Sequence, residues 1–422
     1  MRGQYNESIA REHLAVRPLN YLCSSISVVK EAIRSVRKEG LLGLFGSISF
    51  LCGFAMLVIR GCLGYGRPSD QWGKDFSKIH KAGEIWLSGD NPYLHPTIEY
   101  AYPPHASSVA AFFGMWSFQQ AWWLNFIASI VTLFGILALY LVWFRSSIAQ
   151  GRQDVWWPTL AGFGCVMASN FTTSSVFFGG IAIPVYFSMG LAWFFLYEKR
   201  KPYLAGVFLA FGSLKPQLSL FLCLFLLLDG QWRALLVGAV TALCMSLPAM
   251  IQLGPLGCFE SWLGGLRAYS TNFGENIVGG GGVITFDSAL TAFGVSAISL
   301  KFLGILGFLI AVAYRRHFPR KHLLIVLPFL SLAFIYSHDG DYIAMSLMWL
   351  CLFEVASRNL ARFIILLVLT LLVFIPSTVM QSTGNALLEH WRIFVITTVF
   401  VAYMLWVPVV SALHPGGKLN QS

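Results

Sequence analysis

Charged residues are scarce in this chain. Only 11% of its 422 residues are Asp, Glu, Lys or Arg, whereas soluble domains carry about 25%. At the same time, 56% of the residues are hydrophobic and the mean hydropathy is +0.67. Repeated apolar runs of about 20 residues match the thickness of a lipid bilayer. The composition therefore excludes an ordinary soluble domain and predicts an all-α integral membrane protein with many spans.

The sequence also lacks the cysteine and histidine patterns of metal sites. Its eight cysteines include no CxxC pair and no Cys/His cluster at metal-ligand spacing, so we expect no metal and no other cofactor. Five cysteines lie inside apolar runs, where Cys behaves as a small hydrophobe; these are Cys52, Cys165, Cys223, Cys244 and Cys351. Cys62 and Cys258 both fall in predicted outer loops, where a disulfide between them is an open alternative.

The basic residues do not form a nucleic-acid-binding pattern, although the net charge is +10. Lys and Arg fall in short loops between apolar runs, which is the pattern set by membrane insertion. Residues 1–40 contain no signal peptide, because mixed charges precede the first apolar run. Within them, residues 26–38 form either a basic amphipathic helix on an anionic inner leaflet or a plain topology signal. We expect membrane lipids as partners and no nucleic acid.

The apolar runs predict about 10–12 transmembrane segments. Full spans are expected near residues 41–60, 121–144, 157–178, 180–197, 234–253, 296–314, 322–337, 341–356, 361–379 and 391–412. Residues 106–118 are too short to cross about 30 Å of hydrocarbon and predict an interfacial or re-entrant helix. Residues 203–228 are divided by Lys215 and Pro216, and a proline at that place breaks a helix.

Counting these spans from a cytoplasmic N-terminus predicts the sidedness of every loop. The basic loops then all fall inside: Arg145/Arg152, Lys199–Lys201, Arg315–Lys321 and Arg358/Arg362. We therefore expect a cytoplasmic segment 1–40, a single transmembrane domain 41–412 with outer loops 61–105 and 254–295, and a cytoplasmic tail 413–422. The expected location is the inner (plasma) membrane, with both termini in the cytoplasm.

Several chemically active side chains converge on the predicted outer face. The loop 61–105 is polar and carries Asp75, and the break at Lys215 also points outward. The turn YSHDGDY after the 322–337 run adds His338 and Asp341. A carboxylate there can act as a general base toward an alcohol, and Lys or His can hold a phosphate. The tetraglycine stretch 279–282 is expected to be irregular and could cover a ligand.

The same residues resemble the first extracytoplasmic loop of glycosyltransferase family 87, whose members are membrane enzymes of the GT-C type. The resemblance is carried by Asp75-Phe76, Ala82, Gly89-Asp90-Asn91-Pro92-Tyr93 and Tyr102-Pro103-Pro104. Weaker support comes from Ala205-Gly206 before Lys215-Pro216, from Trp232-Arg233, and from Ser337-His338 with Asp341-Tyr342. One departure is Gly179-Gly180-Ile181, where family members often carry Gly-Gln.

The resemblance implies a GT-C-like fold, with interfacial helices in the outer loops, and an inverting glycosyl transfer. The donor would be a polyprenyl-phosphate sugar such as mannose or arabinose, and the acceptor a lipid-linked or envelope glycan. Asp75 matches the catalytic carboxylate, and Lys215 and His338 would stabilise the leaving phosphate. Asp341 would orient His338, cap the next helix or touch substrate. Tyr93 and Tyr102 are further substrate-binding candidates, with packing as the alternative for both.

Two other function classes remain open from the residues. A broken helix would also suit a secondary transporter or a flippase for lipids or lipid-linked sugars, but such proteins tend to carry two symmetry-related breaks and we find one. An O-antigen-ligase-type enzyme would rely on outward Arg and His, and the outer loops offer only Arg67 and Arg267. Asp70 competes with Asp75 as the acid, although its place after Pro68-Ser69 is more typical of a turn.

Overall fold

The regular structure of this chain is helical. The computed structural model describes residues 40–65, 73–96, 98–149, 154–272, 282–295, 299–316, 318–375 and 386–412, and within them every regular element is a helix. The basic segment 26–38, Asp70, the tail 413–422 and the first three glycines of the 279–282 stretch lie outside these residues.

The helices follow one another with short connections. The first half contains α2 Leu41–Tyr65, α3 Lys74–Ser88, α4 Ala106–Gly114, α5 Phe118–Leu139, the π-helical turn η1 Tyr140–Phe144, α6 Arg145–Ile148, α7 Trp157–Ala168, α8 Asn170–Phe178, α9 Ala182–Tyr197 and α10 Pro202–Gly212. The second half contains α11 Pro216–Leu228, α12 Trp232–Met245, α13 Leu247–Leu253, α14 Pro255–Asn272, α15 Phe286–Ala292, α16 Lys301–Ala313, α17 Arg320–Phe334, the 3₁₀ segment η3 Asp339–Met345, α18 Ser346–Ala356, α19 Leu360–Phe374 and α21 Ala386–Ala412.

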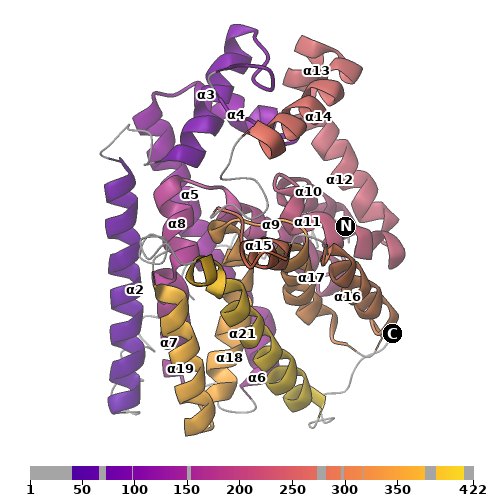
Figure 1. The fold of residues 1–422 in the computed structure, drawn as a ribbon. Helices are drawn as coiled ribbons and strands as arrows, with labels where there is room; N and C mark the ends of the chain where they lie inside the picture. The colour runs from indigo at the N-terminus through magenta and orange to yellow at the C-terminus, as the bar shows by residue number, and fades with distance from the viewer. Residues whose placement is uncertain are drawn as a thin grey trace, which may run out of the picture.

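A layer of helices lies across one end of the apolar bundle. In Figure 1, α3, α4, α13 and α14 gather at the top, while α7, α18 and α19 extend downward beside the long helix α2. We call this end the upper end. The outer loops 61–105 and 254–295 supply α3, α14 and α15, so these loops carry helices, as the sequence predicts. The short helix α4 falls within the separately predicted interfacial helix 106–118.

The helix α3 is the first polar element of this upper layer. It is amphipathic, because its buried residues recur at helical spacing: Phe76, Ile79, His80, Ala82, Gly83, Ile85 and Trp86. Gly73 and Gly89 stand at its two ends with φ of 68° and 90°, which only glycine adopts readily. A Cβ on Gly83 would lie 1.9 Å from the carbonyl oxygen of Ala110 in α4. The glycine therefore lets α3 and α4 pack backbone to backbone.

The described residues contain helices able to cross a bilayer. Three are long and apolar enough, Leu41–Leu63, Phe118–Ile148 and His390–Val407, and two bent pairs bring the number to five. Five shorter apolar helices of 10–17 residues also occur within the described chain. The protein is thus a polytopic all-α membrane protein. Its expected 10–12 segments stay a prediction, because many apolar runs are divided into helices shorter than a full span.

The helix breaks have local chemical causes. Lys215 and Pro216 separate α10 from α11, as predicted, since proline has no amide hydrogen for the helix ladder. The expected single span 157–178 is wrong: Ser169 ends α7 and caps α8, where its Oγ accepts the Thr172 N–H at 3.3 Å. The helices α8 and α9 then meet at 114°.

The loops predicted to face inward also contact one another. Asp229, after α11, pairs with Arg320 at 2.7 Å and with Arg315 at 3.7 Å. Arg145, the first residue of α6, lies 3.6 Å from Glu354 of α18. These contacts agree with the prediction that the basic loops share one side of the bundle.

The structure decides the open alternative of a disulfide between Cys62 and Cys258. Cys62 near the end of α2 and Cys258 in α14 are both free thiols. Cys258 is buried against the upper layer, while Cys62 lies exposed on a bundle helix. A disulfide between them is therefore not part of the fold.

Candidate active site

The break between α10 and α11 meets the turn before α18 through a buried ion pair. Lys215 Nζ donates to Asp341 Oδ1 at 2.7 Å, and the Asp341 side chain is fully buried. Asp341 Oδ2 accepts the His338 backbone N–H at 3.1 Å, and Gln217 Nε2 lies 3.4 Å from the same oxygen. Lys215 lies between α10 and α11, and Asp341 lies in the 3₁₀ segment η3 before α18. The pair thus joins two segments that the sequence predicts on one face.

Each partner of this pair holds the other in its charged form. Burial would raise the pKa of Asp341, but the Lys215 ammonium and the hydrogen bonds from Lys215 and His338 lower it below its usual range. Burial would likewise lower the pKa of Lys215, but Asp341, with Tyr102 and Asp75 adding to the effect, raises it. At neutral pH the site therefore contains a permanent ammonium with donors to spare, since an ammonium has three N–H groups.

His338 is held by both of its ring nitrogens. Nδ1 lies 2.6 Å from the Gly282 carbonyl oxygen and therefore donates, and Nε2 lies 2.8 Å from the Tyr336 hydroxyl. Its backbone N–H is also bonded to Asp341. For the His338 ring to bind a phosphate, Tyr336 would have to turn away first. In the present geometry His338 therefore connects the Gly282 backbone to the 338–341 turn.

Asp75 lies in the first turn of α3, at the edge of this cluster. Its carboxylate is partly exposed and acts electrostatically on Lys215, Tyr102 and Tyr336. Among the described residues we find no hydrogen bond or ion pair that engages it. Lys78, a salt-bridge candidate on the same helix, pairs with Glu99 instead. Asp75 therefore offers an uncommitted carboxylate next to a buried cation.

Aromatic residues cover this cluster from the upper layer. Burial raises the pKa of Tyr102. The charges of Lys215, Asp75 and Asp341 also act on its hydroxyl, so Tyr102 lies near all three. Tyr93 lies behind it: the Tyr93 hydroxyl donates to the Tyr102 carbonyl at 3.0 Å, and its ring packs 5.3 Å from that of Tyr100. Of the two predicted tyrosines, the geometry brings Tyr102 to the charged cluster and leaves Tyr93 as its support.

A second ion pair beside the cluster has no signal in the sequence pattern. Arg392 of α21 is 2% exposed and binds Asp339 Oδ2, and Asn170 of α8 donates to the same oxygen at 2.8 Å. Asp339 lies two residues before Asp341, so the pair ties the turn to two further helices. Arg392 lies 177 positions after Lys215 along the chain. Nothing in its neighbourhood in the sequence indicates this contact.

Other polar residues near the site were also missed. Tyr269 of α14 shares a hydrogen bond with Tyr336, and Asp75 acts electrostatically on both hydroxyls. Gln217 stands two residues after Lys215 and reaches the same carboxylate, so its spacing could have indicated it. His105 at the start of α4 bonds Ser213 at 3.1 Å, and burial lowers the pKa of His105 to about 4. His105 is therefore neutral at pH 7 and links α4 to the helix break.

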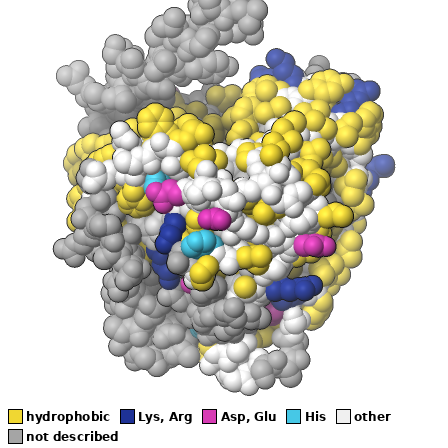
Figure 2. Space-filling model, turned by 90° about the horizontal axis from the view of Figure 1, so that it is seen from above, with side chains coloured by type: hydrophobic (Ala, Val, Ile, Leu, Met, Phe, Trp, Pro, Cys, Tyr) yellow, Lys and Arg dark blue, Asp and Glu magenta, His cyan; other side chains and the backbone are white. Residues whose placement is uncertain are grey.

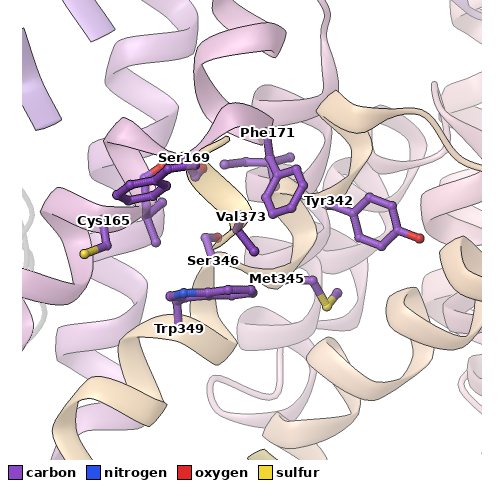
Figure 3. A pocket seen from close by; sticks show the side chains of 11 residues that line it. Cys165, Ser169, Phe171, Tyr342, Met345, Ser346, Trp349 and Val373 are labelled. Atoms are coloured by element: carbon purple, nitrogen blue, oxygen red, sulfur yellow. The ribbon is translucent and has the colours of Figure 1, made fainter. Parts of the chain in front are cut away.

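Charged and histidine side chains reach the surface of the molecule at the upper end (Figure 2). Figure 2 shows acidic, basic and His side chains close together near the middle of that face, with hydrophobic side chains over much of its surroundings. Within the described residues no group of three or more His, Cys, Asp and Glu could hold a metal ion. A neighbouring pocket of about 10 Å³, room for about one water molecule, lies among Phe171, Tyr342 and Trp349 (Figure 3) and contains no charged candidate.

The arrangement can perform proton transfer next to a bound anion. Asp75 can accept a proton, and the Lys215 ammonium can stabilise negative charge that develops on a leaving group. Lys215 is buried and Asp75 is partly buried. This strengthens both effects, because charges interact more strongly away from bulk water. These capabilities fit acyl, phosphoryl or glycosyl transfer, and the geometry alone does not choose among them.

Comparison with known proteins makes that choice. A family model described as glycosyltransferase family 87 matches residues 100–338, which is more than half of the chain. The matched segment contains Tyr102, Lys215 and His338; Asp75 and Tyr93 precede it, and Asp341 follows it. Searches of curated proteins and of solved structures found no match. The chain therefore belongs to glycosyltransferase family 87 and is a membrane glycosyltransferase of the GT-C type.

Proposed function

We propose that this enzyme is an inverting glycosyltransferase that uses a polyprenyl-phosphate sugar as donor. The sugar would be mannose, arabinose or a similar pentose or hexose, and the acceptor a lipid-linked or envelope glycan. The observation that carries the proposal is the uncommitted Asp75 carboxylate beside the Lys215–Asp341 pair. A base and a phosphate-binding cation are the two groups that this reaction needs.

The reaction proceeds as a single displacement. Asp75 takes the proton of the acceptor hydroxyl as that oxygen forms a bond to the anomeric carbon of the sugar. The bond from that carbon to the phosphate oxygen breaks on the opposite face, and the polyprenyl phosphate leaves with the electron pair. Attack and departure on opposite faces invert the anomeric configuration. No further oxidant, reductant or co-reactant is required.

Lys215 stabilises the leaving phosphate. One of its three N–H groups binds Asp341, so two remain for phosphate oxygens. The charge on the phosphate grows as the glycosidic bond breaks, and a fixed cation near the leaving oxygen lowers the barrier most at that moment. His338 and Asp341 set the position of Lys215, and Tyr102 closes the site above it.

The outer face of the inner membrane is the side we assign to the reaction. Two observations support this assignment. Asp75 acts electrostatically on Lys215, which is paired with Asp341 of the 338–341 turn, and two loops predicted to face inward meet at the Asp229–Arg320 ion pair. The insertion rule puts basic loops in the cytoplasm. The donor sugar then reaches the site on its lipid within the bilayer, and the acceptor glycan arrives from outside.

A donor panel tests the proposal. Purified enzyme is incubated with radiolabelled polyprenyl-phosphate mannose, polyprenyl-phosphate arabinose, a polyprenyl-diphosphate sugar and a nucleotide sugar, and the product anomer is determined by NMR. We expect transfer from a lipid monophosphate only, with inverted configuration. Transfer from the lipid diphosphate or from the nucleotide, or a retained anomer, would overturn it.

A further inference from the structure

Gly180 lies close to the Asp75 carboxylate. It stands between α8 and α9, its N–H donates to the Ser175 carbonyl at 2.8 Å, and its φ lies outside the left-handed region. A Cβ built on Gly180 would lie 3.5 Å from Ser175 Oγ, 3.6 Å from Asp75 Oδ2 and 3.7 Å from the Ser175 carbonyl oxygen. The backbone here tolerates a side chain, and the three nearest atoms are all oxygens.

The spacing between Gly180 and Asp75 is fixed from several sides. The Gly73 N–H donates to the Phe177 carbonyl at 3.3 Å and so holds the start of α3 on the end of α8. Asn125 Nδ2 donates to the Gly179 carbonyl at 3.1 Å from α5. A Cβ on Gly179 would lie 2.4 Å from Phe76 Cβ, so the two segments already touch. The close approach of Gly180 to Asp75 is therefore held by contacts of both segments.

The two side chains beside Gly180 suit a hydroxyl group. A hydroxyl donates one hydrogen bond and can accept others, and here Asp75 offers an acceptor and Ser175 offers a donor. The present bond of Ser175 Oγ is a long one, 3.4 Å to the Gly180 carbonyl, so its proton is free to turn. A methyl group at position 180 would occupy the same space without offering either partner.

We propose that Gly180, Ser175 and Asp75 form the subsite for the acceptor hydroxyl, and that the bare backbone at Gly180 determines which acceptors fit. The inference rests on the proposed function, in which Asp75 is the base. The acceptor O–H donates to Asp75 Oδ2 and accepts from Ser175 Oγ. Its proton passes to Asp75 while its oxygen bonds to the anomeric carbon and the polyprenyl phosphate departs. Ser175 orients the nucleophile, and Gly180 leaves room for the carbon that bears it.

Kinetics with separated donor and acceptor constants test this subsite. We expect Gly180→Ala to raise the acceptor KM at least about tenfold, as an extra methyl group in a fitted site does, and to leave the donor KM within about twofold. Ser175→Ala should raise the acceptor KM by a smaller factor. Gly264→Ala in α14 is the control, because nothing lies within 4 Å of its Cβ position; both its constants should stay unchanged.

The outcomes separate this inference from the function on which it rests. Asp75→Asn is measured in parallel. If Asp75→Asn retains transfer, the proposed base is wrong. If Asp75→Asn abolishes transfer but Gly180→Ala leaves the acceptor KM unchanged, the function stands and the subsite is wrong. Should Gly180→Ala fail to fold, Ser175→Ala decides alone, because it removes atoms, and an unchanged acceptor KM overturns the subsite.

Discussion

Lys215 and Asp341 form a 2.7 Å ion pair across 126 residues of sequence. One lies where a proline breaks a helix, and the other lies in the 3₁₀ segment before α18. Burying two charges costs solvation free energy, and a buried pair is weak evidence for stability by itself. The Lys215–Asp341 pair lies near the Asp75 carboxylate, and a role of Lys215 in binding the phosphate explains the buried pair better than a role in stability. This role has testable consequences.

The first prediction concerns the charge on Lys215. Lys215→Met removes the only cation that contacts Asp341 in the described structure, and we expect kcat to fall about 100-fold or more. The double variant Lys215→Met/Asp341→Asn removes both charges of the pair and so leaves no unpaired buried charge. It should melt near the wild-type temperature and stay inactive, which distinguishes the loss of the ammonium from misfolding. Lys81→Met, an exposed lysine on α3, is the matched control. Full activity of the double variant would refute the phosphate-binding role.

The second prediction is a pH dependence of stability. The pKa of Asp341 is lowered in the fold, so its contribution is present above its unfolded pKa of about 3.9 and is lost as the pH falls through the folded value. The pKa of Lys215 is raised, so its contribution is present below its unfolded value of about 10.4 and is lost as the pH rises above it. The pair is therefore intact through neutral pH.

Melting in detergent checks this. Asp341→Asn should lower Tm at pH 7, because it leaves the buried Lys215 without its counter-charge, and the loss should not become smaller as the pH falls from 7 to 5. The difference from the wild type should shrink below about pH 4, where Asp341 of the wild type takes up a proton. A difference that closes between pH 7 and pH 5 would show that some other titrating group controls the stability of this turn.

The third prediction tests whether Arg392 positions the turn. Arg392→Gln and Asp339→Asn each break the same ion pair, so either should lower kcat/KM about tenfold, and Arg392→Lys should recover part of it. In a double-mutant cycle the pair should show a coupling of about 1–3 kcal/mol. Additive losses, with Tm falling in step with activity, would mean that Arg392 only stabilises the fold.

Part of the site followed from the sequence because it depends on local chemistry. The break at Lys215-Pro216 follows from proline's missing N–H, and the cluster of Asp75 with Lys215 and Asp341 follows from counting spans. The apolar content alone specified an all-α membrane protein. Each of these inferences uses a residue type whose physical effect is strong and nearly independent of context.

Other features were missed for equally physical reasons. Interfacial helices were expected in the outer loops, but α3 was not located within the loop 61–105, although Phe76, Ile79, Gly83 and Trp86 recur at helical spacing and could have revealed it. The Ser169 cap divides an apolar run that composition makes look continuous. Arg392 reaches its partner only through tertiary packing, and no pattern along the chain encodes that distance.

The most direct test of the account is single-turnover transfer by Asp75→Asn, which keeps the size of the side chain and removes the base. With saturating polyprenyl-phosphate sugar and acceptor, we predict that the transfer rate falls about 100- to 10,000-fold while donor binding and Tm stay at the wild-type level. Glu84→Gln, an exposed carboxylate on the same helix, should transfer normally. Transfer by Asp75→Asn at the wild-type rate would contradict the role of Asp75 and the mechanism built on it.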